Sequence, residues 1–258
     1  MLIRKLNILA FSDVHAPRYL PLFIASLNAI LNYSPDIIIL AGDIIDHGRT
    51  NALSTVVNPL CKKFPNIPIV AIFGNEEYFD IEDKLINSYS QITWLSDSVL
   101  TLTIKGIKIC IVGSRGVLEK PTPWQRKNIK GIEYMYKKRV EVLRDLLVKA
   151  KQKCEVVILV THYAPTFITV KGEPFTAYPY LGSRSLERIL RETQIDLVIH
   201  GHAHNSRVLE ASLGITRIYN VALPARKGIT KIEFHKVSSR EETQKGLLRF
   251  LKVKGGEK

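Results

Sequence analysis

An α/β fold is the class that the sequence predicts, and three observations predict it. Five apolar segments of strand length, rich in isoleucine and valine, recur along the chain. Segments with helical periodicity lie between several of them. The strand-like segments are almost continuously apolar, which is typical of strands with both faces buried. Such an order of strands and helices favours a largely parallel sheet.

The expected elements follow one another along most of the chain. Strands are predicted at residues 6–11, 36–41, 68–73, 155–161 and 195–200. Helices are predicted at residues 20–33, 80–89, 132–151 and 185–192. The helix at 132–151 is long and rich in charged side chains, so one of its faces is expected to meet solvent.

Other segments depart from this alternation. Residues 99–112 are predicted to form a hairpin, because Lys105-Gly106 lies between two β-branched runs. Residues 120–131, with two prolines and Trp124, are predicted to form a loop. Shorter strand-like runs indicate antiparallel strands that could form a second sheet, and they lie at residues 207–211, 215–221 and 229–234.

Domain organisation and charge limit the possible functions. A single domain is expected over residues 1–237, followed by a polar tail at 238–258, because no repeat or linker divides the chain. The formal net charge of +13 favours anionic partners such as phosphorylated metabolites or nucleic acid. A solvated, lysine-rich surface is the alternative interpretation of that charge.

Cysteine usage and hydropathy indicate the compartment. The three cysteines are far apart and form no CxxC pair, so neither a disulfide framework nor a thiolate metal site is predicted. A reduced, cytoplasmic protein is therefore expected. No apolar run approaches the roughly 18 residues that span a bilayer, and the first residues are too short an apolar stretch for a signal peptide. No membrane partner is expected.

Polar side chains gather where the predicted buried strands end. The clusters share Asp, Asn and His, and comprise Asp13 with His15, Asp43, Asn75, His162, and His200 with His202 and His204. Because ligands of open α/β sheets bind outside the carboxyl ends of the strands, these clusters are expected to converge.

Each cluster alone has an ordinary structural explanation. An Asp after a strand is often a helix N-cap, a lone His is often hydrogen-bonded in the core, and Gly-Asn is common turn chemistry. Five such clusters at one edge of a sheet favour a functional site instead. Imidazoles and carboxylates without thiolates suit Mn, Fe, Co, Ni or Zn. The candidate ligands outnumber those of one tetrahedral ion, which suggests two divalent ions sharing a carboxylate.

The motifs DxH, GDxxDxG, GNxx, a lone His after a strand and GHxH occur in this order between Asp13 and His204. In this combination the sequence resembles the calcineurin-like metallophosphoesterases, and Asn220-Val221 resembles the closing Asn motif of that family. The resemblance implies a four-layer sandwich of two mixed β-sheets flanked by helices. It also implies hydrolysis of a phosphate mono- or diester by a hydroxide that bridges two metal ions.

The resemblance further implies which residues hold the metals. One ion would be held by Asp13, His15 and His204, and the other by Asn75, His162 and His202. Asp43 would bridge the two ions, so that Asp43 and Asn75 are catalytic residues as well as ligands. His200 precedes the motif and is expected to be structural or to orient a neighbouring ligand.

Position 76 departs from the family pattern. Many members place a His after Gly-Asn, where it assists the leaving group, and this chain has Glu76. A protonated Glu76 could act as a catalytic proton donor, but this needs a raised pKa. An ionised Glu76 would repel a dianionic monoester more than a monoanionic diester. A mild preference for diesters or activated leaving groups is therefore predicted.

The substrate and its contacts are less defined. His47 could line the crevice, and Arg115 could contact phosphate, with an ordinary surface Arg as the alternative. Trp124, with Arg126 and Lys127, could clamp an aromatic or nucleotide group, or could simply anchor its loop. The expected partner is a small phosphate-ester or nucleotide-like substrate, with nucleic acid possible.

Two other functions are compatible with the sequence. A nuclease would account for the basic charge, although the chain has little room for an additional nucleic-acid-binding module. A catalytically silent metal-binding scaffold would bind partner proteins. Suitable residues at all seven expected ligand positions argue against such a scaffold.

Overall fold

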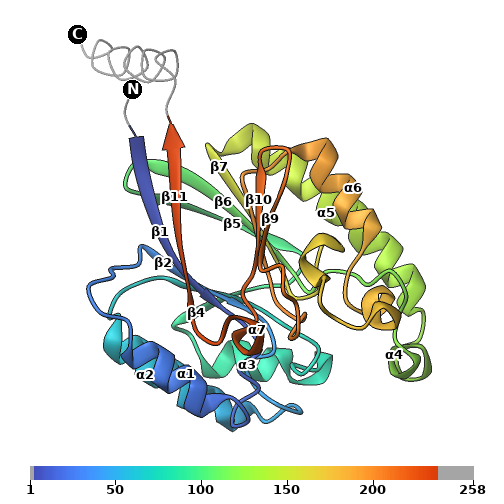
Figure 1. Cartoon of the computed structure of the whole chain (residues 1–258), viewed down its shortest axis with the longest axis horizontal. Coiled ribbons are helices and arrows are strands. Elements are labelled where there is room, and N and C mark those ends of the chain that lie inside the picture. Colours follow the sequence, from blue (N-terminus) through green and yellow to red (C-terminus); the bar gives the residue numbers. More distant parts are fainter. Residues whose placement is uncertain (1–2, 238–258) are drawn as a thin grey trace.

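Two β-sheets pack face to face in the computed structural model, which describes residues 3–237, and helices cover both outer faces (Figure 1). This arrangement confirms the α/β sandwich of two mixed sheets. The predicted polar tail at residues 238–258 lies outside the described residues.

The first sheet has the strand order β11-β1-β2-β3-β4. Its strands are β1 (Ile3–Phe11), β2 (Ile37–Ala41), β3 (Ile69–Ile72), β4 (Ile92–Leu95) and β11 (Thr230–Val237). Strands β1 to β4 pair in parallel, and β11 lies antiparallel to β1. The carboxyl ends of β1, β2 and β3 therefore lie at one edge of this sheet.

The second sheet has the order β5-β6-β7-β8-β10-β9. Its strands are β5 (Ser98–Ile104), β6 (Ile107–Ser114), β7 (Val156–Thr161), β8 (Leu197–His200), β9 (Glu210–Leu213) and β10 (Thr216–Asn220). The four central strands are parallel and the outer two are antiparallel. The five predicted buried strands are thus divided between two sheets, three in the first and two in the second.

Alternating side chains on the buried strands fill different layers. On β1, Leu6, Ile8 and Ala10 join the core between the sheets, where Ile109 and Ile158 of the second sheet also lie. Leu9 and Phe11 face the opposite way and pack in the layer that holds α1 and α2. Both faces of each central strand are therefore covered, which explains the nearly continuous apolar runs.

The helices lie mostly on the two outer faces (Figure 1). Helices α1 (Leu20–Asn28) and α2 (Ser54–Lys63) pack on the first sheet, and α5 (Ile132–Lys153) and α6 (Arg184–Thr193) on the second. The shorter helices are α3 (Glu82–Ser88), α4 (Pro123–Asn128) and α7 (Leu223–Arg226). Single 3-10 turns occur at Thr50–Leu53, Phe79–Ile81, Ile168–Val170 and Phe175–Tyr180.

Two helices and one strand differ from the sequence expectations. Helix α2 was not predicted, because Pro59 inside it is a residue that normally ends a helix. Helix α4 forms within the predicted loop at 120–131, where Thr122 and Gln125 make a capping box. Strand β4 was not predicted, since its four residues carry little periodicity.

The expectation that the cysteines form no disulfide is wrong for one pair. Cys110 on β6 and Cys154 at the end of α5 form a disulfide across 44 residues. Strands β6 and β7 are parallel neighbours in which Cys110 pairs with Val157, so Cys154, just before β7, lies close to Cys110, with 5.7 Å between their Cα atoms. Sequence spacing cannot reveal such a pair, because the contact depends on strand pairing.

No described helix is long and apolar enough to cross a membrane. The cytoplasmic location stays a prediction.

Candidate metal centre

Loops at the carboxyl ends of strands from both sheets meet at one site. The amide of Asp13, after β1, donates to the Gly42 carbonyl after β2 at 3.0 Å. The amide of Gly201, after β8, donates to the His162 carbonyl after β7 at 3.1 Å. The Asn220 side chain at the end of β10 donates to the carbonyl of Ala203 at 2.9 Å. These bonds fix the loops relative to one another.

The predicted ligands form two compact groups. Candidate ligand atoms of Asp13, His15 and His204 all lie within 4.8 Å of one another. The same holds for Asp43, His162 and His202. The side chain of Asn75 joins the second group, because its Oδ1 lies 3.1 Å from Nε2 of His162. The structure therefore brings together all seven predicted ligand positions.

The two carboxylate oxygens of Asp13 have different neighbours: Oδ2 is held by its own loops, and Oδ1 faces imidazoles. Its Oδ2 accepts from the hydroxyl of Ser12 at 2.5 Å and from the amide of His202 at 2.9 Å. Its Oδ1 lies 2.8 Å from Nε2 of His204 and 3.7 Å from Nε2 of His15. The oxygen that faces the two imidazoles is the one left for a ligand.

Asp43 lies between the two groups. Its Oδ1 accepts from the amide of Glu76 at 2.8 Å. Its Oδ2 lies 3.7 Å from Nε2 of His15 in the first group and 3.2 Å from Nε2 of His162 in the second. A single carboxylate oxygen thus faces both groups.

Hydrogen bonds to backbone carbonyls select the ring nitrogens that face the site. Nδ1 of His162 lies 3.0 Å from the Ala41 carbonyl, and Nε2 of His202 lies 3.1 Å from the Tyr180 carbonyl. A carbonyl can only accept, so each of these nitrogens carries the proton. The opposite nitrogens, Nε2 of His162 and Nδ1 of His202, are left with lone pairs for a metal.

His15 provides the observation that best tests whether a metal fits. Its imidazole is buried, and within residues 3–237 neither Nδ1 nor Nε2 has a hydrogen-bond partner. Among the described residues, His15 is the one side chain with two such atoms. Buried polar atoms without a partner are costly in free energy, so an absent ligand is the simplest explanation. A divalent metal bound by nitrogen and oxygen donors fits these residues.

The backbone is strained at several of the same positions. Asp13, His15, Asp43 and His202 have φ values of 57°, 42°, 51° and 70°, in the left-handed region. Such a conformation costs free energy in residues other than glycine and clusters at functional sites. The fold therefore places these side chains at a local cost in stability.

Two glycines permit the close approach of the loops. Gly42 has a φ of 84°, and a Cβ there would lie 2.8 Å from Nδ1 of His162. A Cβ on Gly74 would lie 2.1 Å from Oδ1 of Asp43. Gly42 is needed for the left-handed backbone beside Asp43, and Gly74 is needed because a side chain there would collide with Asp43.

In the described part of the chain, the buried carboxylates of Asp13 and Asp43 have no basic partner other than histidine. Burial alone would raise the pKa of Asp13, but the charge of His204 beside it holds that pKa below its usual value. Burial would likewise raise the pKa of Asp43, but the charge of His162 holds that pKa below its usual value. Asp43 in turn raises the pKa of His162 to about 9 despite burial. Burial, then His162, lowers the pKa of His202 to about 3.

The shifts of Asp13, Asp43 and His162 show that the two carboxylates favour positive charge beside them. Among the described ion pairs of Asp13 and Asp43, every partner is a histidine. Buried carboxylates are normally paired with a cation or bound to a metal.

Glu77 holds the loop that carries Asp43. Its two carboxylate oxygens accept from the amides of Asp43 at 2.8 Å, Ile44 at 2.7 Å, Ile45 at 3.1 Å and Gly74 at 2.8 Å. Burial, followed by the charge of Asp43, raises the pKa of Glu77 to about 7, and these amides oppose that rise. Each oxygen receives two N–H donors, so the geometry is that of an ionised carboxylate.

Glu76 touches the second group through Asn75. Its Oε1 accepts from Nδ2 of Asn75 at 3.2 Å, and its Oε2 accepts from the amide of His47 at 2.8 Å. A carboxylate oxygen can only accept, so Asn75 presents its Nδ2 to Glu76. The Oδ1 of Asn75 then points toward His162. Glu76 therefore positions Asn75.

The structure places the two predicted substrate contacts differently. His47 is exposed beside Glu76, with Nδ1 3.0 Å from Oδ2 of Asp46. Arg115 is buried, and its guanidinium donates to the Glu77 carbonyl at 2.9 Å and to Glu82 at 2.6 Å. Arg115 is thus not the surface residue of the alternative interpretation. Contact of either side chain with phosphate stays a prediction.

His200 is a buried structural residue, as expected. Its Nε2 lies 2.7 Å from the hydroxyl of Thr169 and its Nδ1 2.8 Å from the carbonyl of Gly201. Burial lowers the pKa of His200 to about 4, which keeps the ring neutral.

Sequence reasoning missed several residues that support the site. Ser12 beside Asp13 gave no signal of its own, because a serine after a strand is common. The Tyr180 carbonyl could not be found from the sequence, since it acts through the backbone.

Comparisons with known proteins agree with this geometry. The family model described as calcineurin-like phosphoesterase matches residues 6–206. The chain belongs to the calcineurin-like phosphoesterase family. Its members are metal-dependent phosphoesterases, so the chain is assigned as one, with the two ligand groups as candidate metal sites. No curated protein matches the sequence.

Similar solved structures share the fold. Phosphopantetheinyl hydrolase of Mycobacterium tuberculosis is 16% identical, with a TM-score of 0.60 over 88% of this chain and 96% of that one. A dimetal phosphatase from Danio rerio is 13% identical, with a TM-score of 0.58 over 83% of this chain and 86% of that one. A putative 5′-nucleotidase from Staphylococcus aureus is 14% identical, with a TM-score of 0.57. The match covers 93% of this calcineurin-like phosphoesterase and 52% of that longer chain.

Proposed function

We propose that this phosphoesterase hydrolyses small phosphate esters at a binuclear metal site. One ion would be held by Asp13, His15 and His204, and the other by Asn75, His162 and His202, with Asp43 shared between them. The observation that carries the proposal is the position of Asp43 Oδ2, which faces an imidazole of each group at 3.7 and 3.2 Å. The donor types suit Mn, Fe, Co, Ni or Zn.

The residues of the chain supply orientation and charge. A bound metal pair supplies an activated water and neutralises charge on the phosphate. Asp43 would be a ligand shared by both metal sites. The carboxylate of Glu77 fixes Asp43 by accepting a hydrogen bond from the backbone amide of Asp43. The carbonyls of Ala41 and Tyr180 hold the rings of His162 and His202 with their lone pairs inward.

Glu76 supports the preference for diesters or activated leaving groups. Both of its carboxylate oxygens accept from N–H donors, which favours the ionised form over a proton donor. A negative charge beside Asn75 repels a dianionic monoester more strongly than a monoanionic diester. The expected substrate is therefore a small diester, or a monoester with a good leaving group.

Substrate pairs test this preference. We expect bis-aryl phosphate diesters to be hydrolysed with a higher kcat/KM than the aryl monoester, in the presence of Mn²⁺. The Glu76→Gln variant should reduce the ratio of diester to monoester kcat/KM, because it should improve monoester hydrolysis. A clear preference of the parent protein for the monoester contradicts the role given to Glu76.

Variants at the shared ligand test the metal site. Asp43→Ala should lower kcat by more than the roughly 10–100-fold that loss of an outer partner costs. His235→Ala is the control, since His235 is exposed and pairs in register with Lys5, far along β1 from Asp13. Equal activity of Asp43→Ala and His235→Ala would refute the assignment.

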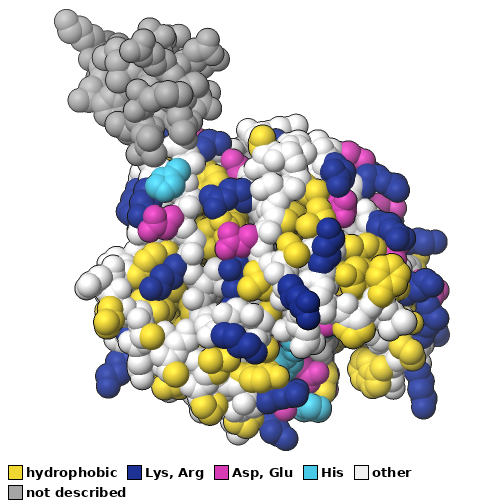
Figure 2. Space-filling view, viewed as in Figure 1, with side chains coloured by type: hydrophobic (Ala, Val, Ile, Leu, Met, Phe, Trp, Pro, Cys, Tyr) yellow, Lys and Arg dark blue, Asp and Glu magenta, His cyan; other side chains and the backbone are white. Residues whose placement is uncertain are grey.

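Nucleic acid is a possible substrate that the same assays can assess. Figure 2 shows Lys and Arg side chains spread over the viewed face, among acidic and hydrophobic ones. The formal charge of +13 favours anionic substrates in general. Faster cleavage of DNA or RNA than of small esters, with binding that weakens steeply in salt, would replace the small-ester proposal by a nuclease.

A further inference from the structure

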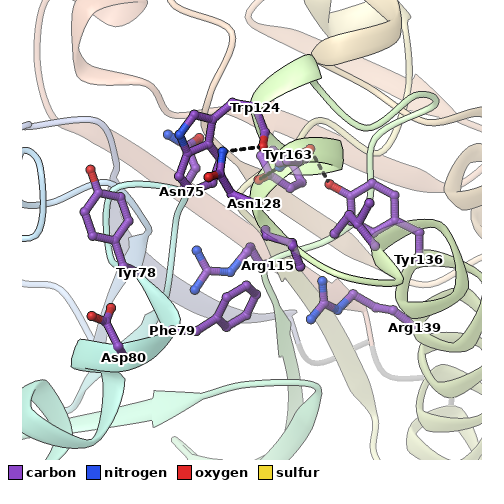
Figure 3. Close-up of a pocket in the computed structure, with 13 residues that line it drawn as sticks. Asn75, Tyr78, Phe79, Asp80, Arg115, Trp124, Asn128, Tyr136, Arg139 and Tyr163 are labelled. Carbon is purple, nitrogen blue, oxygen red and sulfur yellow. Dashed lines mark hydrogen bonds between the residues drawn. The ribbon is translucent and has the colours of Figure 1, made fainter.

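A cavity of about 350 Å³, with five aromatic side chains in its walls, lies beside the proposed metal centre. We call it the aromatic cavity, and its walls include Tyr78, Phe79, Trp124, Ile129, Tyr136 and Tyr163. Its volume falls within the range of about 300–1,000 Å³ that is typical of small-molecule sites. In Figure 3, Tyr78 and Phe79 lie across the cavity from Tyr136, with Trp124 above them.

The aromatic cavity adjoins the metal centre. A second cavity of about 390 Å³, the site cavity, includes the predicted ligands Asn75 and His202. Asn75, Tyr78 and Trp124 line both cavities. A phosphate ester bound at Asn75 and His202 can therefore extend its remaining part past Trp124 into the aromatic cavity.

Two large aromatic side chains at this cavity are left open to solvent. Trp124 is 59% exposed and Phe79 46% exposed. The guanidinium of Arg115 lies over the Phe79 ring, 4.5 Å from its centroid. Aromatic faces and guanidinium planes are the surfaces on which planar rings stack. The sequence alternative, that Trp124 only anchors its loop, does not fit this exposure.

Arg126 and Lys127 do not form a clamp with Trp124 around a bound aromatic or nucleotide group. Arg126 lies 3.6 Å from Glu133 and lines a different cavity. Lys127 lines neither the aromatic nor the site cavity. The groups that accompany Trp124 are instead Phe79 and Arg115, which come from other segments of the chain.

The position of Trp124 is fixed by its helix. Gln125, the next residue on α4, makes the capping box with Thr122. Its amide also donates to the hydroxyl of Tyr163 at 3.0 Å and accepts from that of Tyr136 at 3.1 Å. These bonds tie α4 to α5 and to the loop after β7, so the aromatic wall is preorganised.

Three charged side chains line the cavity: the two arginines are paired with carboxylates, and the third side chain, Asp80, is itself acidic. Arg115 contacts Glu82 at 2.6 Å, and Arg139 contacts Asp97 at 2.8 Å. A second phosphate in the cavity would have to compete with these carboxylates. Asn128 and the remaining N–H groups of Arg115 provide polar contacts for a neutral heterocycle. The walls therefore suit a planar, uncharged ring that carries hydrogen-bonding atoms.

We propose that the aromatic cavity binds the leaving group of the substrate, and that this group carries a planar heterocycle, as a nucleoside does. The assignment rests on the proposed phosphoester hydrolysis at Asn75 and His202. Hydrolysis forms a phosphorus–oxygen bond to water and breaks the bond to the nucleoside oxygen. The nucleoside then leaves as an alcohol after taking a proton.

Matched esters test the assignment by activity. The methyl phosphodiester at the 5′ oxygen of a nucleoside is compared with the same diester of ribose, which releases a similar primary alcohol without the base. We expect the nucleoside ester to have a roughly tenfold higher kcat/KM, the size of one stacking contact. Trp124→Ala should abolish most of this ratio, and the control Tyr134→Ala, on an exposed aromatic outside both cavities, should retain it.

The benzyl methyl phosphodiester separates a heterocycle from any aromatic ring. If the benzyl ester has the same kcat/KM as the nucleoside ester, the preference for a heterocycle is refuted. If the nucleoside and ribose esters have equal kcat/KM, the cavity assignment is refuted. A Trp124→Ala variant with an unchanged ratio of nucleoside-ester to ribose-ester kcat/KM would also refute the cavity assignment.

Fluorescence tests binding independently of hydrolysis. Trp94, the other tryptophan, stacks on Phe73, and its Nε1 has no partner, so Trp94→Phe leaves Trp124 as the sole reporter at little cost. A free nucleoside should quench this emission saturably in metal-free protein, and ribose should not. Saturable quenching without hydrolysis of any ester would refute the phosphoesterase proposal alone. Hydrolysis without quenching would refute the cavity assignment alone.

Discussion

Replacing Glu77 by glutamine tests how the Asp43 loop is held. The carboxylate accepts from four backbone amides at 2.7–3.1 Å. Glutamine keeps one oxygen for two of these amides and turns an NH₂ group toward the other two. Two buried N–H groups then lose their acceptor, and each unsatisfied buried group costs about 1–3 kcal/mol. The free energy of unfolding should fall by about 2–6 kcal/mol.

The assay is urea denaturation in the presence of a chelator, so that bound metal does not contribute to stability. Glu133→Gln is the matched control, because Glu133 is exposed and its ion pair with Arg126 spans 3.6 Å. It should change the unfolding free energy by less than about 1 kcal/mol. A Glu77→Gln protein as stable as this control would refute the reasoning.

Three further changes test other parts of the account. His15→Leu should leave metal-free stability unchanged or higher, because the buried imidazole has no hydrogen-bond partner among the described residues. The same variant should bind Mn²⁺ more weakly in a titration. A large loss of metal-free stability would contradict this. Gly74→Ala should abolish metal binding in a protein that is still folded by circular dichroism, since its Cβ would lie 2.1 Å from Asp43 Oδ1, and normal metal affinity would contradict it. Replacing Cys110 and Cys154 together by alanine should lower the unfolding free energy by about 2–4 kcal/mol, and thiol alkylation of the unfolded parent should label Cys61 alone. Labelling of all three cysteines would show that the disulfide is absent.

The ligand set could be predicted because its residues stand directly after buried strands. Asp13, Asp43 and His162 each follow an apolar run that needs no tertiary information to recognise. The family resemblance then assigned them to two groups, and the structure brings those groups together.

The division into two sheets could not be derived from the runs themselves. The segments that became β1 and β7 look alike in sequence, since each is covered on both faces. Which strands pair depends on contacts between distant residues, and the family resemblance supplied that information. The disulfide between Cys110 and Cys154 was missed for the same reason.

The aromatic cavity also depends on the tertiary fold. Phe79 follows β3, Trp124 lies on α4 and Tyr136 on α5, and no sequence spacing connects the three. Trp124 alone was a candidate from the sequence, because Arg126 and Lys127 lie beside it in the predicted loop. Its exposure and its neighbours needed coordinates.

Metal content per chain tests the central claim most directly. Purified protein loaded with Mn²⁺ and freed of excess metal should contain two ions per chain by elemental analysis, and Asp43→Ala should contain fewer, with His235→Ala unchanged. A parent protein that binds one ion or none, or an Asp43→Ala variant that keeps both, would contradict a shared carboxylate between two metal sites.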